Sequence, residues 1–341
     1  MIWAEAEGCS VVDTEGRSYI DLSGGFGVAA LGHRNPEILA ALSAQAGRCI
    51  HALGDLAEAD VTVELRARLG REGRVAMLGV TGEDAVEIAL RTALLVTRRP
   101  GIVAFTGAYH GTGLLALAAT GFEQFRSPFA SWLPGPIHRR PYGDDPGPLP
   151  ADAACVIVEP VQGRAGAQVP PDGFLECLRE RCDEAGALLI ADEIYTGLGR
   201  TGALWRSGEL ADVLTCGKAL GGGLPISACL MRTEHHAAWN LGPEDVYTHT
   251  HIGNPLAAAA ALVVLDRVPA LLERAAAAGE RFEAAGWHGA GLLRAKEGDA
   301  FSAWERGVIV IPAGEDGRYM SATPPLTITD EEIDEALERI G

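Results

Sequence analysis

The segment 215–225 contains the residue with the clearest chemical potential, a lysine at the end of an apolar run. Lys218 follows that run directly and comes shortly before three glycines at 221–223. A buried ammonium costs free energy unless it is neutralised, and formation of a Schiff base with an aldehyde neutralises it. The glycines let the backbone approach a bulky ligand closely. For this motif alone, a lysine on a flexible surface turn is the simpler interpretation.

Asp192 supplies a second chemical group, at the end of an apolar run that precedes Lys218 in the chain. Open α/β sheets place their active sites at this carboxyl edge. In enzymes that use pyridoxal 5'-phosphate (PLP), an aspartate keeps the pyridine nitrogen protonated and makes the ring a better electron sink. A carboxylate that caps the next turn is the alternative for Asp192 alone. The two residues together favour PLP chemistry.

Two further strand ends carry candidate cofactor contacts. Gly82 and Glu83 open the helical pattern 83–97, and the free N–H groups of a helix N-terminus bind phosphate well. The same residues also fit an ordinary capping box, so this motif is weak alone. Tyr109 and His110 follow another apolar run, where the tyrosine either stacks on a planar cofactor or fills the core.

The elements that must position these residues form an alternating series. Short apolar runs without period-two alternation are typical of strands buried on both faces of a mostly parallel sheet. Helical patterns at 83–97 and 172–185 lie between several of them. This alternation predicts a doubly wound α/β domain, because a TIM barrel would need eight regular units. The predicted strands are 75–80, 101–105, 155–158, 187–191, 213–216 and 226–231.

The two ends of the chain depart from this series. Helix-like stretches occupy 33–70, Ala-rich helical sequence includes 257–263, and a strand is predicted at 307–312. Thr329 opens a last amphipathic helix with an acidic first turn. The predicted parts are an N-terminal segment 1–50 contributing to a small lobe and the active-site entrance, a large PLP-binding domain 51–252 with a surface loop at 134–150, and a compressed small C-terminal domain 253–341.

The composition narrows the partners and the compartment. A count of 28 Lys and Arg against 46 Asp and Glu gives a formal charge of −18, which repels nucleic acids and anionic membranes. Seven cysteines without a close pair indicate reduced thiols, and no signal segment or membrane-spanning run is evident, so we expect a cytoplasmic protein. His249 and His251 lack the spacing of metal ligands, and we expect no metal.

These motifs resemble those of the class III aminotransferases, PLP enzymes of fold type I that act on ornithine, 4-aminobutyrate and ω-amino acids. The resemblance implies a large domain with a mostly parallel mixed sheet flanked by helices, and a smaller α+β lobe. It covers nearly the whole chain. The most specific motifs are 192–202 and 217–225, and the others are 21–25, 32–33, 159–163, 249–250, 253–256 and 324–329.

The resemblance implies roles for the residues around the ring of the cofactor. Lys218 would form the Schiff base with PLP and move the proton between substrate and cofactor. Asp192 would bind the pyridine nitrogen, and His110 would support the cofactor. Ile194 and Tyr109 would pack on opposite faces of the ring.

Other positions match residues around the phosphate and the substrate. The backbone of Gly82 and Glu83 would bind the phosphate, and Thr250 would reach the phosphate of a neighbouring subunit, which implies a homodimer with shared active sites. Glu159 would lie near the cofactor and the amino group of the substrate. Tyr195 stands where many relatives have glutamine near the ring hydroxyl.

Three departures from the family concern the pocket. The chain starts close to the first family motif and its C-terminal lobe is compressed, so we expect a more open pocket or a greater dependence on the partner subunit. Ser321 replaces an arginine that clamps the α-carboxylate in many relatives. Arg164 stands where many relatives have Glu or a small residue. It either takes over the recognition of a carboxylate or other acidic group, or is a surface arginine paired with a neighbouring acid. Phe26 matches a substrate-facing position and would add an apolar wall.

The resulting hypothesis is a PLP-dependent aminotransferase. It would move an amino group between an amine or (ω-)amino acid and a carbonyl acceptor through the Lys218 Schiff base. A PLP-dependent aminomutase, or a racemase or epimerase of the same family, would use the same lysine, aspartate and phosphate site. A non-catalytic protein with a PLP-enzyme fold is the third alternative, although it would have no need to retain Lys218, Asp192 and Thr250 together.

Overall fold

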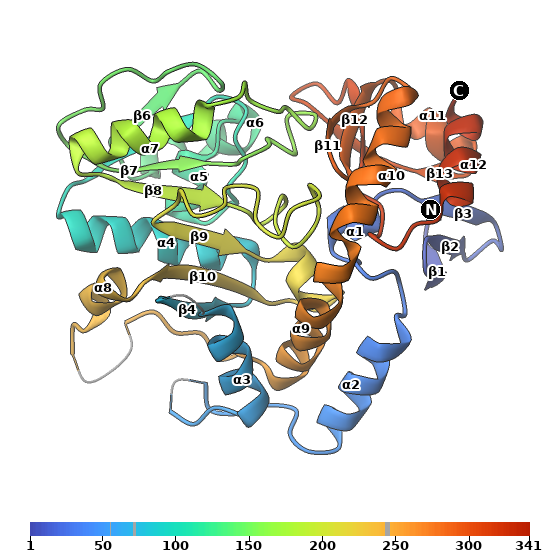
Figure 1. Ribbon diagram of the computed structural model, residues 1–341, viewed down its shortest axis with the longest axis horizontal. Coiled ribbons are helices and arrows are strands. Elements are labelled where there is room, and N and C mark those ends of the chain that lie inside the picture. The colour runs from blue at the N-terminus through green and yellow to red at the C-terminus, as the bar shows by residue number, and fades with distance from the viewer. Residues whose placement is uncertain (55, 71–72, 243–245) are drawn as a thin grey trace.

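A seven-stranded sheet forms the centre of the computed structural model, which describes residues 1–54, 56–70, 73–242 and 246–341 (Figure 1). Its strand order is β4-β10-β9-β8-β7-β5-β6, and β10 runs antiparallel to both of its neighbours while the other pairs are parallel. All six predicted strands are confirmed within this sheet. The strands are β4 (Arg74–Gly79), β5 (Gly101–Phe105), β6 (Ile137–Arg140), β7 (Ala153–Val158), β8 (Leu188–Asp192), β9 (Val213–Cys216) and β10 (Ser227–Arg232).

Two helices on opposite faces explain why these strands are apolar throughout. Helix α4 (Gly82–Thr97) packs on the face that includes Ile190, whereas α7 (Phe174–Ala185) packs on the face that includes Leu189. Successive side chains of a strand point to opposite faces, so a sheet covered on both sides needs no polar positions. Helix α7 begins two residues later than predicted because Gly173 is in the left-handed region, at φ 82°.

Two predictions, a surface loop at 134–150 and a single strand at 307–312, were wrong. The stretch 134–150 is not only a surface loop, because it includes the edge strand β6, which pairs in parallel with β5. This strand is half-buried and largely polar, so it lacks the apolar run that marks its neighbours. The predicted strand 307–312 is divided into β13 (Val308–Ile309) and β14 (Ile311–Ala313), which belong to different sheets.

The small lobe combines both ends of the chain. Strand β3 (Ser18–Asp21) pairs in parallel with β13, so N-terminal and C-terminal segments share one sheet (Figure 1). The last helix, α12 (Asp330–Ile340), begins with the capping box of Thr329 and Glu332, which confirms its predicted start. The domain boundaries remain a prediction. The other strands here are β1 (Trp3–Glu7), β2 (Ser10–Asp13), β11 (His288–Ala290), β12 (Leu293–Glu297) and β15 (Tyr319–Ala322).

The Ala-rich segment is a buried helix, as predicted. Helix α9 (Pro255–Arg267) packs against α2 (Pro36–Ala46) and α3 (Asp60–Leu69) through its buried alanines. Among the described residues, the helical stretch Pro255–Ala284 is long and apolar enough to cross a membrane by length and composition alone, contrary to the sequence-based expectation. The packing of α9 against its neighbours provides another reason for that apolar character.

The remaining helices are short, apart from α10. They lie between the longer elements along the chain. The α-helices are α1 (Gly24–Gly27), α5 (Leu114–Ala119), α6 (Glu123–Arg126), α8 (Thr233–His236), α10 (Leu272–Ala284) and α11 (Ala300–Glu305), and the 3-10 helices are Ser127–Trp132, Lys218–Gly221, Ala237–Trp239 and Val268–Leu271.

Candidate active site

A cavity of about 540 Å³ lies where the carboxyl ends of the central strands meet the small lobe. Twelve of the thirteen site residues predicted from the sequence line it, and Thr250 does not. The small lobe supplies residues 311–313 and Ser321 to the opposite wall. The twelve residues are Phe26, Gly82, Glu83, Tyr109, His110, Glu159, Arg164, Asp192, Ile194, Tyr195, Lys218 and Ser321.

Lys218 points its amine into this cavity from the end of β9. Its backbone has φ 32°, in the left-handed region that non-glycine residues adopt only rarely. Its Nζ lies 4.1 Å from the centroid of the Tyr195 ring, whose face attracts a cation. Desolvation by the surrounding protein lowers the pKa of Lys218, so a larger share of the amine is unprotonated and nucleophilic than in water.

Three groups fix the carboxylate of Asp192 at the end of β8. Thr215 Oγ1 and the Ile194 N–H donate to Oδ1 over 3.1 and 3.2 Å. His110 Nδ1 lies 2.7 Å from the other oxygen, Oδ2. All three contacts of this carboxylate are within hydrogen-bond distance, and the aspartate is buried. Its orientation is therefore set before any ligand binds.

The N-terminus of α4 keeps two N–H groups available for an anion. Thr81 Oγ1 accepts a hydrogen bond from the Asp84 N–H, and the Asp84 carboxylate accepts bonds from the N–H groups of Val80 and Thr81. This capping box therefore exists, but it leaves the N–H groups of Gly82 and Glu83 out of its hydrogen bonds. Both residues line the cavity, where the helix dipole favours a negative charge.

Glycines at two positions let Ile194 approach the cavity closely. A Cβ atom on Gly82 would lie 3.0 Å from Ile194 Cγ2, and one on Gly217 would lie 3.1 Å from Ile194 Cδ1. Both distances are tighter than ordinary van der Waals contact. Tyr109 lines the same cavity, so the structure brings together the two residues that were predicted to enclose a planar ring.

Glu159 is a buried carboxyl group beside the same cavity. Tyr109 donates its backbone N–H to Glu159 Oε1 over 2.8 Å. Desolvation raises the pKa of Glu159 to about 7, against the pull of neighbouring positive groups. A carboxyl group with this pKa takes up and releases a proton near neutral pH.

Thr250 and Phe26 are both exposed in the isolated chain. Phe26 is 55% exposed, lines the cavity and has φ 63°, so the cavity wall includes a large apolar side chain that is also open to solvent. Thr250 lies outside the residues that line the cavity. The adjacent residues Tyr247 and His249 contact the Asp84 carboxylate at 3.1 and 3.3 Å, which ties this segment to the start of α4.

Sequence reasoning missed several residues that build the site. Thr215, which orients Asp192, lies only three residues before Lys218, and its position on the same strand was a usable signal. Thr120 accepts the His110 N–H over 3.0 Å, and Tyr195 Oη lies 3.3 Å from Thr323 Oγ1. The Tyr195–Thr323 contact joins segments 128 residues apart, and neither contact left a recognisable pattern in the sequence.

The groups present fit PLP on structural grounds. A desolvated amine, a fixed carboxylate and a helix N-terminus with spare N–H groups match the aldehyde, pyridine nitrogen and phosphate of that cofactor. The close approach at Gly82 and Gly217 shapes the space between them. In the described part of the chain, no group of three or more His, Cys, Asp or Glu side chains is arranged to hold a metal ion.

Relatives of known activity resemble the chain over most of its length. The family model described as aminotransferase class-III matches residues 1–285. Putrescine aminotransferase of Pectobacterium atrosepticum is 34% identical over 98% of this chain and 80% of its own. Acetylornithine aminotransferase of Corynebacterium efficiens is 37% identical over 98% of this chain and 90% of its own.

Solved structures agree with this assignment. Ornithine aminotransferase from Toxoplasma gondii superposes with a TM-score of 0.91 at 30% identity, covering 99% of this chain and 89% of its own. An amine transaminase from an uncultivated Pseudomonas species, solved in a PLP-bound form, superposes with a TM-score of 0.90 at 26% identity, covering 100% of this chain and 93% of its own. The chain therefore belongs to the class III aminotransferases and is a PLP-dependent transaminase of fold type I.

Proposed function

We propose that the cavity at Lys218 transfers an amino group between an amine or ω-amino acid and a carbonyl acceptor, with Lys218 as the group that moves the proton. The observation that carries this proposal is the convergence of the Lys218 amine, the Asp192 carboxylate and the N-terminus of α4 on one cavity. When bound, PLP supplies an aldehyde that condenses with amines and a ring that withdraws electrons from the bond to the departing proton.

The residues of the chain supply position and proton transfer. Desolvation keeps part of the Lys218 population unprotonated, as a base requires. Thr215 and His110 hold the Asp192 carboxylate, which would bind a positive ring nitrogen of the cofactor in a charge-assisted contact. The free N–H groups of Gly82 and Glu83 would hold an anionic group in the same cavity.

The test follows both half-reactions of the holoenzyme. We expect a stoichiometric keto or aldehyde product from the donor and an equal amount of aminated acceptor. A mutase or racemase would instead convert a single substrate without an acceptor. Lys218→Ala should lower turnover by at least about 1000-fold, as expected for loss of the group that moves the proton. Lys296→Ala, which changes the other lysine of the chain, should retain activity. Full activity of Lys218→Ala would contradict the proposal.

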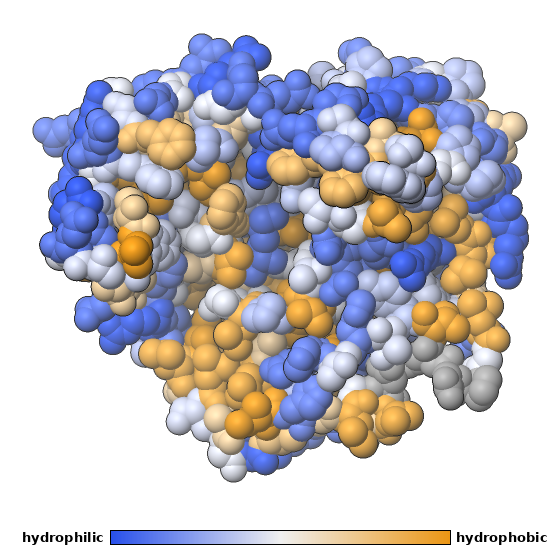
Figure 2. All heavy atoms as spheres, turned by 180° about the vertical axis from the view of Figure 1, so that it is seen from behind, coloured by the Kyte–Doolittle hydropathy of each residue, from blue (hydrophilic) through white to orange (hydrophobic). Residues whose placement is uncertain are grey.

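We further propose that two copies of the chain complete each other's sites. Large apolar side chains are exposed along 39–63, among them Ile50, Leu53 and Leu56 at 58%, 70% and 86%. Figure 2 views the molecule from behind and shows apolar residues gathered over its lower part, where α2 and α3 lie in Figure 1. Such a patch favours burial against a second copy, and the exposed Thr250 would then reach the partner's cofactor phosphate.

Mixed dimers test the shared site directly. Thr250→Ala should weaken cofactor binding, and Lys218→Ala should be inactive. If Thr250 serves the partner's site, a hybrid of the two variants contains one site with both residues intact. Activity of the refolded mixture at limiting PLP should therefore exceed that of either parent. A mixture that equals the average of its parents, or a chain that sediments as a monomer, would contradict this arrangement.

A cytoplasmic location is also proposed. All seven cysteines are free and five of them are buried, which supports a compartment that keeps thiols reduced. Fractionation of cells that produce the chain should place it with cytoplasmic markers. Recovery with exported proteins would contradict the proposal.

A further inference from the structure

Arg164 is a cation in the wall of the cavity, and among the described residues its charge has no ion-pair partner. It lines the cavity together with Lys218. Within the described ranges, no carboxylate lies within ion-pair distance of Arg164, and its only recorded side-chain contacts are with aromatic rings. The alternative of a surface arginine paired with a neighbouring acid therefore does not hold. A guanidinium beside a cavity and without an anion is ready to bind one.

The carboxylates around the cavity are already engaged elsewhere. Glu83 accepts bonds from the Thr112 N–H and Oγ1 and from the Gly113 N–H. Glu159 accepts the Tyr109 N–H, and Asp192 has the three partners described above. None of these groups is paired with Arg164, so its charge remains available to a ligand.

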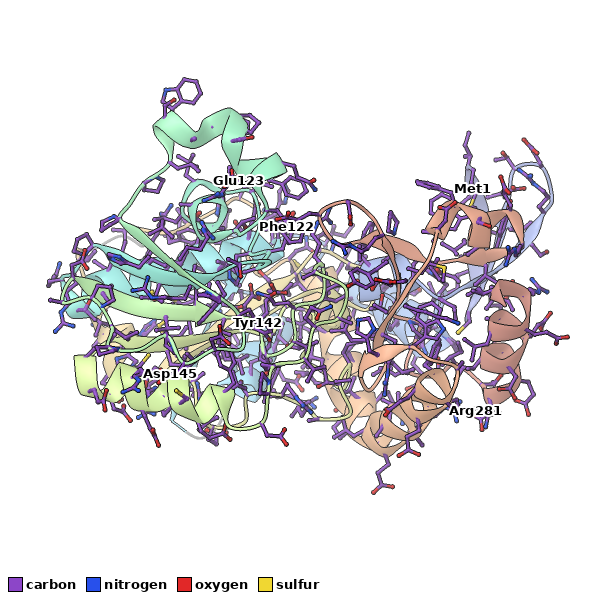
Figure 3. The ribbon with its side chains drawn as sticks, turned by 90° about the horizontal axis from the view of Figure 1, so that it is seen from above. Met1, Phe122, Glu123, Tyr142, Asp145 and Arg281 are labelled. Atoms are coloured by element: carbon purple, nitrogen blue, oxygen red, sulfur yellow. The ribbon has the colours of Figure 1, made fainter. Side chains whose placement is uncertain are left out.

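Three aromatic rings hold the guanidinium in place. Its central carbon lies 5.0 Å from the centroid of Tyr109, 4.9 Å from that of Phe125 and 5.9 Å from that of Phe122. In Figure 3, Phe122 lies on the side of the large sheet that faces the C-terminal lobe. Stacking uses the faces of a guanidinium and leaves its N–H edge free for bidentate hydrogen bonds, which an ammonium could not make in this way.

The backbone of Arg164 is fixed by a tight turn. Gly166 and Ala167 donate their N–H groups to Gly163 O, and Gln162 pairs with Gln168 in an antiparallel bridge. The carbonyl of Arg164 accepts the Gly314 N–H over 2.8 Å, which attaches the turn to the small lobe. A side chain on so constrained a turn is placed before a ligand arrives.

Ser321 provides a second unsatisfied group in the same cavity. It is 2% exposed, and its Oγ has no hydrogen-bond partner within the described residues. A buried hydroxyl without a partner costs free energy that a bound acceptor would recover. Ser321 lines the cavity from β15, whereas Arg164 lines it from the large domain.

We propose that Arg164 and Ser321 form a recognition site for a substrate carboxylate, so that at least one substrate of this enzyme is an amino acid or oxo acid. The inference rests on the proposed transamination and names its substrate class. A carboxylate matches the N–H edge of a guanidinium bidentately and accepts a further hydrogen bond from a hydroxyl. Burial is the main cause that lowers the pKa of Lys218, and the charge of Arg164 lowers it further, so the two groups are near enough to interact.

Matched substrate pairs that differ by a single carboxylate test the proposal in separate half-reactions. The donors are 5-aminovalerate with pentylamine and alanine with isopropylamine, and the acceptors are pyruvate with acetone. In at least one pair we expect the holoenzyme to prefer the member that carries the carboxylate. Arg164→Gln should raise the KM for that member by about 10- to 100-fold and change the KM for the member without a carboxylate by about twofold at most. Ser321→Ala should raise the same KM less, by about three- to tenfold.

Control variants separate recognition from folding. Arg91→Gln removes another guanidinium that lies 5.0 Å from a tyrosine ring, outside the cavity, and should keep the preference. Arg164→Lys keeps a charge without the bidentate edge and should lie between wild type and Arg164→Gln. A carboxylate preference that survives in folded Arg164→Gln, or equal use of both members of every pair by the wild type, would overturn the proposal.

A binding measurement keeps this inference separate from the proposed function. Valerate carries the carboxylate but no amine, so it binds without reacting. Calorimetry should show that the holoenzyme binds valerate at least about tenfold more tightly than Arg164→Gln does. If no amine reacts yet valerate binding depends on Arg164, the proposed function fails and the carboxylate site stands. Valerate binding that is equal in both proteins would overturn the site.

Discussion

The acidic residues around Lys218 differ in what holds them. Asp192 is fixed by a hydroxyl, a backbone N–H and an imidazole. Glu159 accepts a single recorded hydrogen bond, and burial dominates its protonation. Residues of one chemical type therefore take different roles because their surroundings differ. Asp192 is arranged as a fixed partner for a positive group, whereas Glu159 can exchange a proton near neutral pH.

The raised pKa of Glu159 predicts a pH dependence of the stability of the apoprotein. Because the folded pKa, about 7, exceeds the usual 4.5, the stabilising effect is complete below pH 4.5 and is lost as the pH rises through 7. This shift corresponds to about 3 kcal/mol at most. Glu159→Gln cannot titrate, so its free energy of unfolding should fall less than that of the wild type between pH 5 and 8. Denaturant unfolding of both apoproteins across this range measures the difference, and parallel curves would contradict the assignment.

At the scale of elements, the start of α4 combines two functions. The capping box of Thr81 and Asp84 stabilises the helix, and the N–H groups of Gly82 and Glu83 remain for an anion. The capping-box pattern in the sequence is therefore compatible with helix capping alone and with anion binding as well. The structure favours anion binding in addition to capping, because Gly82 lies against Ile194 and lines the cavity, which helix capping alone does not require.

Gly82→Ala should therefore weaken cofactor binding without weakening the helix. Alanine is the better helix former, but its Cβ would lie 3.0 Å from Ile194 Cγ2 and force that side chain to move. We expect the Kd for PLP to rise about tenfold, measured by titrating the apoprotein and following the visible absorption of the bound cofactor. Gly242→Ala is the matched control, since a Cβ there meets nothing within 4 Å. Equal affinities of the two variants would contradict this role for Gly82.

Elements with a strong local pattern could be predicted from the sequence. The buried strands of the central sheet form apolar runs because helices cover both faces, and α12 is marked by its capping box. Strand β6 lacks such a run because it lies at an edge and is half-buried. The division of 307–312 into β13 and β14 depends on pairing with strands far away in the chain, which a local pattern cannot report.

At the scale of the whole molecule, one half of the site was predictable and the other was not. Lys218, Asp192 and Gly82 each follow a strand of one sheet, so their convergence follows from topology. The wall formed by residues 311–313 depends on how the small lobe packs against the large domain. The ring contacts of Arg164 likewise join segments that no sequence motif relates.

We predict that Lys218 binds PLP covalently, and the small number of lysines in the sequence allows a direct test. Lys218 and Lys296 are its only two lysines. Borohydride reduces a lysine–aldehyde linkage to a stable secondary amine, so treatment of the holoenzyme followed by peptide mass spectrometry locates the cofactor. We expect the pyridoxyl group on Lys218, with Lys296 unmodified as the internal control. Modification of Lys296 instead, or of neither lysine in protein saturated with PLP, would contradict it.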